Sequence, residues 1–160
     1  MILAIETIIL CIIFFLLCFG GTGTDDKNLK SYSSYPDEVQ NRIKSIAEYQ
    51  GKFKESNKVA TFISNFLLFL FVLFILGLFI KENGFTHNFL CLCIIGQGLN
   101  IFDLFIVDLL WWRNTKRVRL RKIPEKELYQ NPKKHIEAFI RAFIMYLLIA
   151  LIDGYILTLL

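Results

Sequence analysis

Proline is scarce in this sequence: there are three in 160 residues, and all three lie outside the long apolar segments. Proline in a helix interior breaks or kinks the helix, so the apolar segments carry no signal for such a break. No glycine within them stands beside a proline either. The discontinuous spans on which many transporters build their binding sites are therefore not predicted.

The cysteines indicate neither a disulfide bond nor a metal site. The four cysteines form two close pairs, Cys11 with Cys18 and Cys91 with Cys93, and each pair falls within one apolar segment. Two cysteines at these spacings within one intact helix cannot form a disulfide bond. A metal site requires convergent ligands with supporting hydrogen bonds, and no such pattern is present in the sequence. We expect no metal and no cofactor.

The first ten residues contain no lysine or arginine and include Glu6. A secretory signal peptide opens with a basic segment, and its apolar stretch ends at small residues that allow cleavage. Large residues flank Cys18, so no convincing cleavage site follows the apolar stretch. We therefore expect the first apolar segment to be a retained helix.

Apolar residues make up 55% of the sequence and aromatic residues 15%, with sixteen phenylalanines. The apolar residues gather in four segments, 3–19, 60–80, 89–110 and 138–156. Each is close to the ~20 residues that a spanning helix requires. The sequence predicts an all-α integral membrane protein, a four-helix bundle in which residues 1–160 form a single transmembrane domain. The net charge of +4 lies in the loops, so no nucleic-acid partner is expected.

Basic residues orient the predicted spans. The loop 20–58 carries seven lysines and arginines, the loop 112–135 carries nine, and the turn 81–87 carries only Lys81. Because cytoplasmic loops are enriched in lysine and arginine, both basic loops are expected in the cytoplasm. The protein is thus predicted to be a multi-pass protein of the cell membrane with both termini outside.

The first cytoplasmic loop contains a predicted helix. Pro36 and the acids that follow it are typical of a helix start, and Val39, Ile43 and Ile46 recur at helical spacing. We expect a short amphipathic helix over 36–49. It would lie on the inner leaflet or cap the bundle, and a solvated connector helix is the alternative.

Two carboxylates, Asp103 and Asp108, stand inside the third apolar segment. A charged side chain near the bilayer centre costs about 2.5–3.5 kcal/mol even on insertion scales, so each should face protein or water and have a partner. With His135 they are the candidate catalytic residues. A structural role, in which polar groups hold the helices together, is the alternative. The predicted polar network pairs Asp108 with Arg141, and Asp103 with Asn65 and Ser64. Its members are Asn65, Gln97, Asn100, Asp103, Asp108 and Arg141.

A helix start is predicted at Asn131 and Pro132, with the asparagine as N-cap and the proline at the first helical position. The residues 133–135 are then cationic or titratable groups in a first turn, where the helix dipole disfavours positive charge. A lipid phosphate or Asp108 would supply the anion that this turn needs.

The second cytoplasmic loop begins with a basic cluster directly after the pair Trp111 and Trp112, which is typical of an aromatic anchor at headgroup depth. Such clusters attract anionic lipid by about 1 kcal/mol per basic side chain. Ordinary orientation of the spans is the alternative explanation. Alternation of basic and apolar residues over 116–123 predicts an extended strand. The predicted lipid- or phosphate-binding residues are Arg113, Lys116, Arg117, Arg119, Arg121 and Lys122.

The D-x4-D-x2-W segment, the basic stretch before Pro124 and the series Tyr129, Pro132 and His135 resemble a pattern of small uncharacterised four-span membrane proteins of Gram-positive bacteria. The resemblance covers about a third of the chain and implies no activity.

Three classes of function follow from these features. The small size favours an accessory or interaction component of a membrane complex, with a membrane-protein partner or a second copy of the chain. A membrane-embedded enzyme acting on lipid headgroups would use Asp103 or Asp108 as base and the segment 117–122 to hold phosphate. A small proton- or cation-coupled transporter would use the same acids as binding groups. Whether the protein is an enzyme is left open by the sequence.

Overall fold

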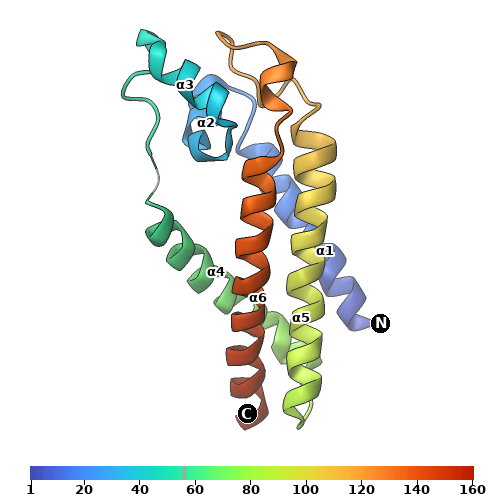
Figure 1. Ribbon diagram of the computed structural model, residues 1–160. Helices are drawn as coiled ribbons and strands as arrows, with labels where there is room; N and C mark the ends of the chain where they lie inside the picture. Colours follow the sequence, from blue (N-terminus) through green and yellow to red (C-terminus); the bar gives the residue numbers. More distant parts are fainter. Residues whose placement is uncertain (56) are drawn as a thin grey trace. The chain divides into compact units, whose positions relative to one another are not determined.

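The computed structural model describes residues 1–55 and 57–160, and within them the chain is 77% helical and contains no strand. Four of the described helical segments are long and apolar enough to cross a membrane: Ile2–Gly20, Lys58–Ile80, Phe85–Trp112 and Lys126–Leu159. Figure 1 shows the α-helices along the chain. The prediction of an all-α chain with four candidate spans is confirmed at this level.

The described elements are of three kinds. The α-helices are α1 (Ile2–Gly20), α2 (Asp25–Lys30), α3 (Asp37–Ser45), α4 (Lys58–Ile80), α5 (Phe85–Phe102) and α6 (Lys133–Leu159). The 3-10 helices are η1 (Tyr32–Ser34), η2 (Ala47–Tyr49) and η4 (Lys126–Tyr129), and η3 (Asp103–Trp112) is a π-helix.

Asparagine side chains mark the starts of two long helices. The Asn57 carboxamide oxygen accepts hydrogen bonds from the backbone N–H groups of Val59 (3.0 Å) and Ala60 (3.3 Å) at the start of α4. At α6, Asn131 accepts from Lys133 N–H at 3.0 Å, and the Pro132 carbonyl accepts the first helical bond. Helix α6 therefore begins one residue later than the sequence predicts, with Pro132 in the capping position.

The third apolar segment changes its winding at Asp103. Helix α5 is followed directly by the π-helix η3, and the Arg113 N–H donates to the carbonyl of Asp108, five residues earlier, at 3.3 Å. A π-helix is rare and occurs frequently at functional sites. Because residues five apart are bonded neighbours in this winding, Asp103 and Asp108 share a side of η3. An α-helix would place them 140° apart at 100° per residue.

The chain divides into two compact units, and the prediction of a single transmembrane domain stays a prediction. The helical unit consists of Met1–Ile13, Asn57–Phe102 and Phe139–Leu160. The second unit consists of Phe14–Ser56 and Asp103–Ala138, and we call it the loop module. The two predicted cytoplasmic loops thus belong to one compact unit.

Glycines bring the helices of the helical unit close together. A Cβ atom added to Gly96 on α5 would lie 3.0 Å from the Tyr146 side chain of α6, and one added to Gly154 on α6 would lie 3.1 Å from the backbone of Phe89. Small residues at helix contacts are typical of membrane bundles, since they allow the backbones to approach.

Large apolar side chains remain exposed along α4. Leu67, Leu68, Phe71 and Phe79 are each more than half exposed, between 56% and 68%. In a protein surrounded by water, a continuous exposed apolar surface of this kind marks an interaction or membrane site. The surface of α4 fits contact with lipid tails or with another span.

The loop module has a hydrophobic core of its own. The Tyr35 ring packs against Trp112 (5.1 Å between centroids) and edge-on against Tyr129 (5.6 Å), which joins the first loop to the second. Its hydroxyl donates to the Val118 carbonyl at 2.7 Å. The core comprises Leu29, Tyr32, Tyr35, Val39, Ile43, Tyr49, Trp112, Val118, Leu120, Ile123 and Tyr129.

The amphipathic helix of the first loop is shorter than predicted and faces a different environment. It spans Asp37–Ser45 as α3, and Ile46 then adopts an extended conformation before the 3-10 helix η2. Val39 and Ile43 are completely buried in the core of the loop module. The apolar face of α3 is therefore covered by protein and cannot lie on a lipid leaflet.

The predicted strand over 116–123 is wrong. The segment is a series of turns in which only Leu120 and Ile123 form an isolated bridge. The core explains the alternation of residue types: Val118, Leu120 and Ile123 are each at most 1% exposed, and the chain turns tightly to bury all three. The alternating pattern follows from which side chains are buried and does not indicate an extended backbone.

Candidate functional site

Asp108 and His135 form a buried carboxylate–imidazole contact inside the loop module. Asp108 lies in η3 and His135 in the first turn of α6, with 2.9 Å between Oδ1 of the acid and Nδ1 of the imidazole. The His135 residue is 5% exposed, and its ring stands edge-on to Trp112 at 4.9 Å between centroids. The carboxylate and the indole together fix the orientation of the imidazole.

The second ring nitrogen of His135, Nε2, is buried and has no hydrogen-bond partner in the described part of the chain. A carboxylate that binds one imidazole nitrogen and leaves the other free is the arrangement used for general-base catalysis. Buried polar atoms normally have partners, so a free one is a candidate for function. The described residues contain no group of three or more metal-ligating side chains, so the pair does not extend into a metal centre.

Asp103 is the second acid of the site. It is partly buried and lies within electrostatic range of Asp108, and both acids are within range of the Cys18 thiol. The π winding of η3 brings the two carboxylates to one side. The loop module thus holds three predicted catalytic candidates, Asp103, Asp108 and His135, in one neighbourhood.

Two members of the predicted polar network lie together in the helical unit. The Asn100 carboxamide donates to Gln97 Oε1 at 3.4 Å and to the Phe139 carbonyl at 3.2 Å. Gln97 in turn donates to the Phe143 carbonyl at 3.0 Å. Both side chains bind backbone of α6, which is the role of polar residues that hold helices together.

The other two predicted network residues in the helical unit are exposed. Asn65 is exposed on α4. Arg141 is exposed on α6 and lines a small apolar hollow with Lys58, Val59 and Phe62 of α4. The predicted pairing of these residues with Asp103 and Asp108 stays a prediction.

The six basic residues predicted to bind lipid have separate roles. Arg117 donates through Nε to the Phe19 carbonyl and to Thr22 Oγ1, both at 3.1 Å, and its guanidinium lies 3.9 Å above the Phe19 ring. Lys122 pairs with Glu48 at 3.0 Å. Arg117 thus joins two segments of the loop module, whereas Lys122, Lys116 and Arg121 are all exposed and the Lys122–Glu48 pair contributes little to stability.

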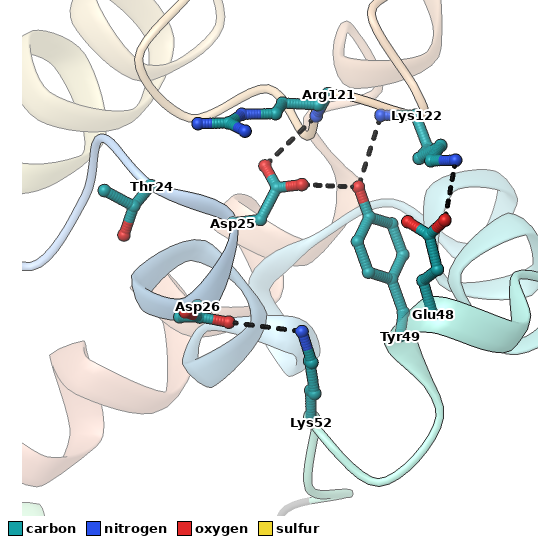
Figure 2. A pocket seen from close by; sticks show the side chains of 8 residues that line it. All are labelled: Thr24, Asp25, Asp26, Glu48, Tyr49, Lys52, Arg121 and Lys122. Carbon is teal, nitrogen blue, oxygen red and sulfur yellow. Dashed lines mark hydrogen bonds and ion pairs between the residues drawn. The ribbon is translucent and has the colours of Figure 1, made fainter.

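A surface hollow of about 470 Å³ opens on the loop module. Figure 2 shows Asp25 at its centre, accepting from the Arg121 backbone N–H (3.1 Å) and from the Tyr49 hydroxyl (2.7 Å). Burial, and next the bond to Asp25, raise the pKa of Tyr49 to about 12. The lining residues are Thr24, Asp25, Asp26, Glu48, Tyr49, Lys52, Arg121 and Lys122.

Sequence reasoning missed this hollow. Its lining comes from three segments that meet only because the two loops share a core. One signal was present, since Thr24 followed by two acids is a helix start, and Thr24 does cap α2 by accepting from Lys27 N–H. Nothing in the sequence indicates that Tyr49 and Arg121 come to the same place.

Comparison of the chain with protein-family models, with curated proteins and with solved structures finds no match in any of the three. The resemblance to small four-span membrane proteins therefore stays a prediction, and function has to be argued from the residues themselves.

Proposed function

We propose that this chain is an integral membrane four-helix bundle of the cell membrane that serves as an accessory or interaction component of a membrane complex. The two basic loops, 20–58 and 112–135, are placed in the cytoplasm and both termini outside. The observation that carries the proposal is the folded loop module, in which both polar loops share an aromatic core. Loops that merely connect spans have no need of a common core.

The burial of the titratable groups Asp108 and His135 supports an interaction role over catalysis. Asp108 and His135 are bonded to each other and shielded, with side-chain exposures of 15% and 6%. The second imidazole nitrogen of His135 is shielded from solvent as well. Buried pairs of this kind hold a structure in one arrangement. The exposed features of the module are its hollow and its free cations.

The exposed face of α4 supports membrane insertion and leaves room for a partner in the bilayer. Lipid tails, a span of another membrane protein or a second copy of this chain would each cover it. The distribution of lysine and arginine supports the orientation, since the two basic loops form the loop module and the turn 81–87 carries only Lys81.

Cysteine labelling tests the orientation. Single cysteines at Asn83 and Thr86 should react with an impermeant reagent added outside intact cells, and a cysteine at Lys116 should react only after permeabilisation. A reporter fused after Leu160 should read as external. Labelling of Lys116 from outside, with Asn83 protected, would reverse the proposed topology.

A photo-crosslinking amino acid tests the interaction role. Placed at the exposed Arg121 in living cells, it should give a discrete protein adduct of one mass. The matched control is the same amino acid at the exposed Asn83, which lies in the proposed external turn and should not give that adduct. Adducts with lipid alone at Arg121 would contradict the proposal.

One observation favours a second function, an enzyme acting on lipid headgroups: the unpartnered Nε2 of His135, whose imidazole is oriented by Asp108. The test is release of water-soluble headgroup from vesicles that contain the purified protein. His135→Gln should abolish release if the imidazole is the base, whereas the exposed-site variant Lys116→Gln should retain it. Absence of release by the unaltered protein across zwitterionic and anionic lipids would rule out this function.

A further inference from the structure

Two arginines of the basic cluster, Arg113 and Arg119, differ from the other four cations. Both are half-buried, and the Nε atom of each is shielded from solvent without a hydrogen-bond acceptor in the described residues. Neither forms an ion pair with an acid in that part of the chain. Arg117 and Lys122, by contrast, are held by protein partners.

The backbone brings these two arginines to one turn. Arg119 donates through Nη2 to the carbonyl of Asn114, at 3.3 Å, and Asn114 directly follows Arg113. The turn is fixed from both sides, because Asn114 donates through Nδ2 to the Leu110 carbonyl at 2.8 Å, and Gln130 donates to the Arg113 carbonyl at 2.7 Å. The guanidinium of Arg119 is therefore held at the backbone of Asn114, the residue that follows Arg113 in the sequence.

Nearby acids do not supply the missing acceptors. Asp108 is bonded to His135, Glu125 to Arg42 at 2.7 Å and Glu48 to Lys122. Buried N–H groups without acceptors are rare in proteins, and a bound ion or ligand can supply the acceptor that the chain does not. Two half-buried arginines on one turn, each with an unused Nε–H donor, fit an anion with several oxygens.

We propose that Arg113 and Arg119 together bind a phosphate group. The planar fork of a guanidinium presents N–H groups at the spacing of phosphate oxygens, and two forks bring enough donors to surround one phosphate. The source is either the headgroup of an anionic phospholipid or free phosphate, and titration with each in turn separates the two. This inference is independent of the interaction role proposed above, because it rests on the unpartnered donors of Arg113 and Arg119 and not on the hollow.

Aromatic residues next to the site support the lipid source. Trp111 packs edge-on against Phe15 at 5.3 Å between centroids, and lies 6.1 Å from Phe19. Tryptophan at the end of a span is typical of the headgroup level of a bilayer. Arg113 follows two residues later, so a lipid phosphate at that depth would meet the guanidinium without reorganisation of the chain.

The test uses the full chain, purified in a non-ionic detergent and titrated with short-chain phosphatidylglycerol and, separately, with inorganic phosphate. A ligand that binds only the folded state raises the unfolding temperature in a saturable manner. We expect phosphatidylglycerol to do so for the unaltered protein. Arg113→Gln and Arg119→Gln should each weaken the apparent affinity about tenfold or more, the effect of losing a charged hydrogen bond.

Lys116→Gln and Arg121→Gln are the matched controls, since each removes one positive charge from the same loop at an exposed position. Both should leave the shift within about twofold of the unaltered protein, because exposed charges contribute little. An equal loss in all four variants would mean diffuse attraction of anions and would overturn the site. A lack of any shift with either ligand would overturn it as well.

A shift with inorganic phosphate as large as with phosphatidylglycerol would support the site and identify free phosphate as its ligand. If Arg113→Gln fails to fold, Arg113→Lys preserves the charge and removes the planar fork. That variant should fold and lose the shift. Full retention of the shift by Arg113→Lys and Arg119→Lys would show that charge alone matters and would contradict the proposed geometry.

Discussion

The imidazole Nδ1 of His135 lies 2.9 Å from the carboxylate Oδ1 of Asp108, so the end of the third apolar segment is bonded to the first turn of the fourth. The first turn of a helix, where the dipole is positive, favours contact with a carboxylate. Asp108 supplies that carboxylate at His135. Lys134, in the same turn, contacts Asp37 at 2.7 Å.

Breaking this pair should destabilise the protein. Asp108→Asn and His135→Gln are each expected to lower the free energy of unfolding by about 1.5–3 kcal/mol, the range for a hydrogen bond to a charged group. The double variant should lose less than the sum, because each single change leaves a buried partner unpaired. Chemical unfolding in detergent measures all three. Strictly additive losses would show that the two side chains do not interact.

Tyr35 should be the most sensitive hydroxyl of the loop module. Tyr35→Phe keeps the ring in the core and removes the donor to the Val118 carbonyl, so we expect a loss of about 1–3 kcal/mol for the buried acceptor left behind. The control is Tyr155→Phe on α6, where the residue is 60% exposed, and it should change stability little. An unaltered unfolding midpoint for Tyr35→Phe would place the hydroxyl in water.

Gly23 and Gly20 should respond in opposite directions to alanine. Gly23 has a φ of +109°, and a Cβ atom there would lie 2.8 Å from Arg117 Cζ, so Gly23→Ala should cost about 1–3 kcal/mol. A Cβ at Gly20 would meet nothing within 4 Å, and Gly20→Ala at the end of α1 should be neutral or stabilising. Thermal unfolding of both variants gives the comparison. Equal tolerance would mean that Arg117 does not occupy the space above Gly23.

Alkaline pH should lower the stability of the protein through ionisation of Tyr49. Its pKa is raised from 10.0 to about 12, so the neutral phenol is the form that the folded protein favours. The stabilisation is therefore fully present below pH 10 and is lost as the pH rises through 12. Tyr49→Phe should differ most from the unaltered protein below pH 10 and converge with it above pH 12. A stability difference that stays constant between pH 9 and 12 would contradict the raised pKa.

The sequence predicts the long helices well, because twenty consecutive apolar residues leave a chain few alternatives. The start of α6 is predicted to within one residue by Asn131 and Pro132. The need for anions beside Lys134 and His135 follows from the helix dipole, and the structure supplies Asp37 and Asp108. Of these two partners, only Asp108 is predicted from the sequence.

The remaining features depend on contacts that local patterns do not encode. Residues of a predicted helix can be assigned to faces only at an assumed 100° per residue, and this spacing does not hold from Asp103 onward, where the winding becomes that of a π-helix. The core of the loop module joins Tyr35 to Tyr129, and the hollow joins Asp25 to Arg121, across most of the chain. Such pairings require knowledge of both loops at once.

The bond between Arg117 and the Phe19 carbonyl joins residues 98 positions apart, so it fixes an order of events during synthesis. When α1 leaves the ribosome, the arginine that closes its last turn has not yet been made. Burial of Tyr35, Val39 and Ile43 likewise requires Val118 and Tyr129, which are made later. The first loop therefore cannot bury these side chains in their final core until the second loop has been made. During that interval its apolar side chains are available to chaperones and proteases.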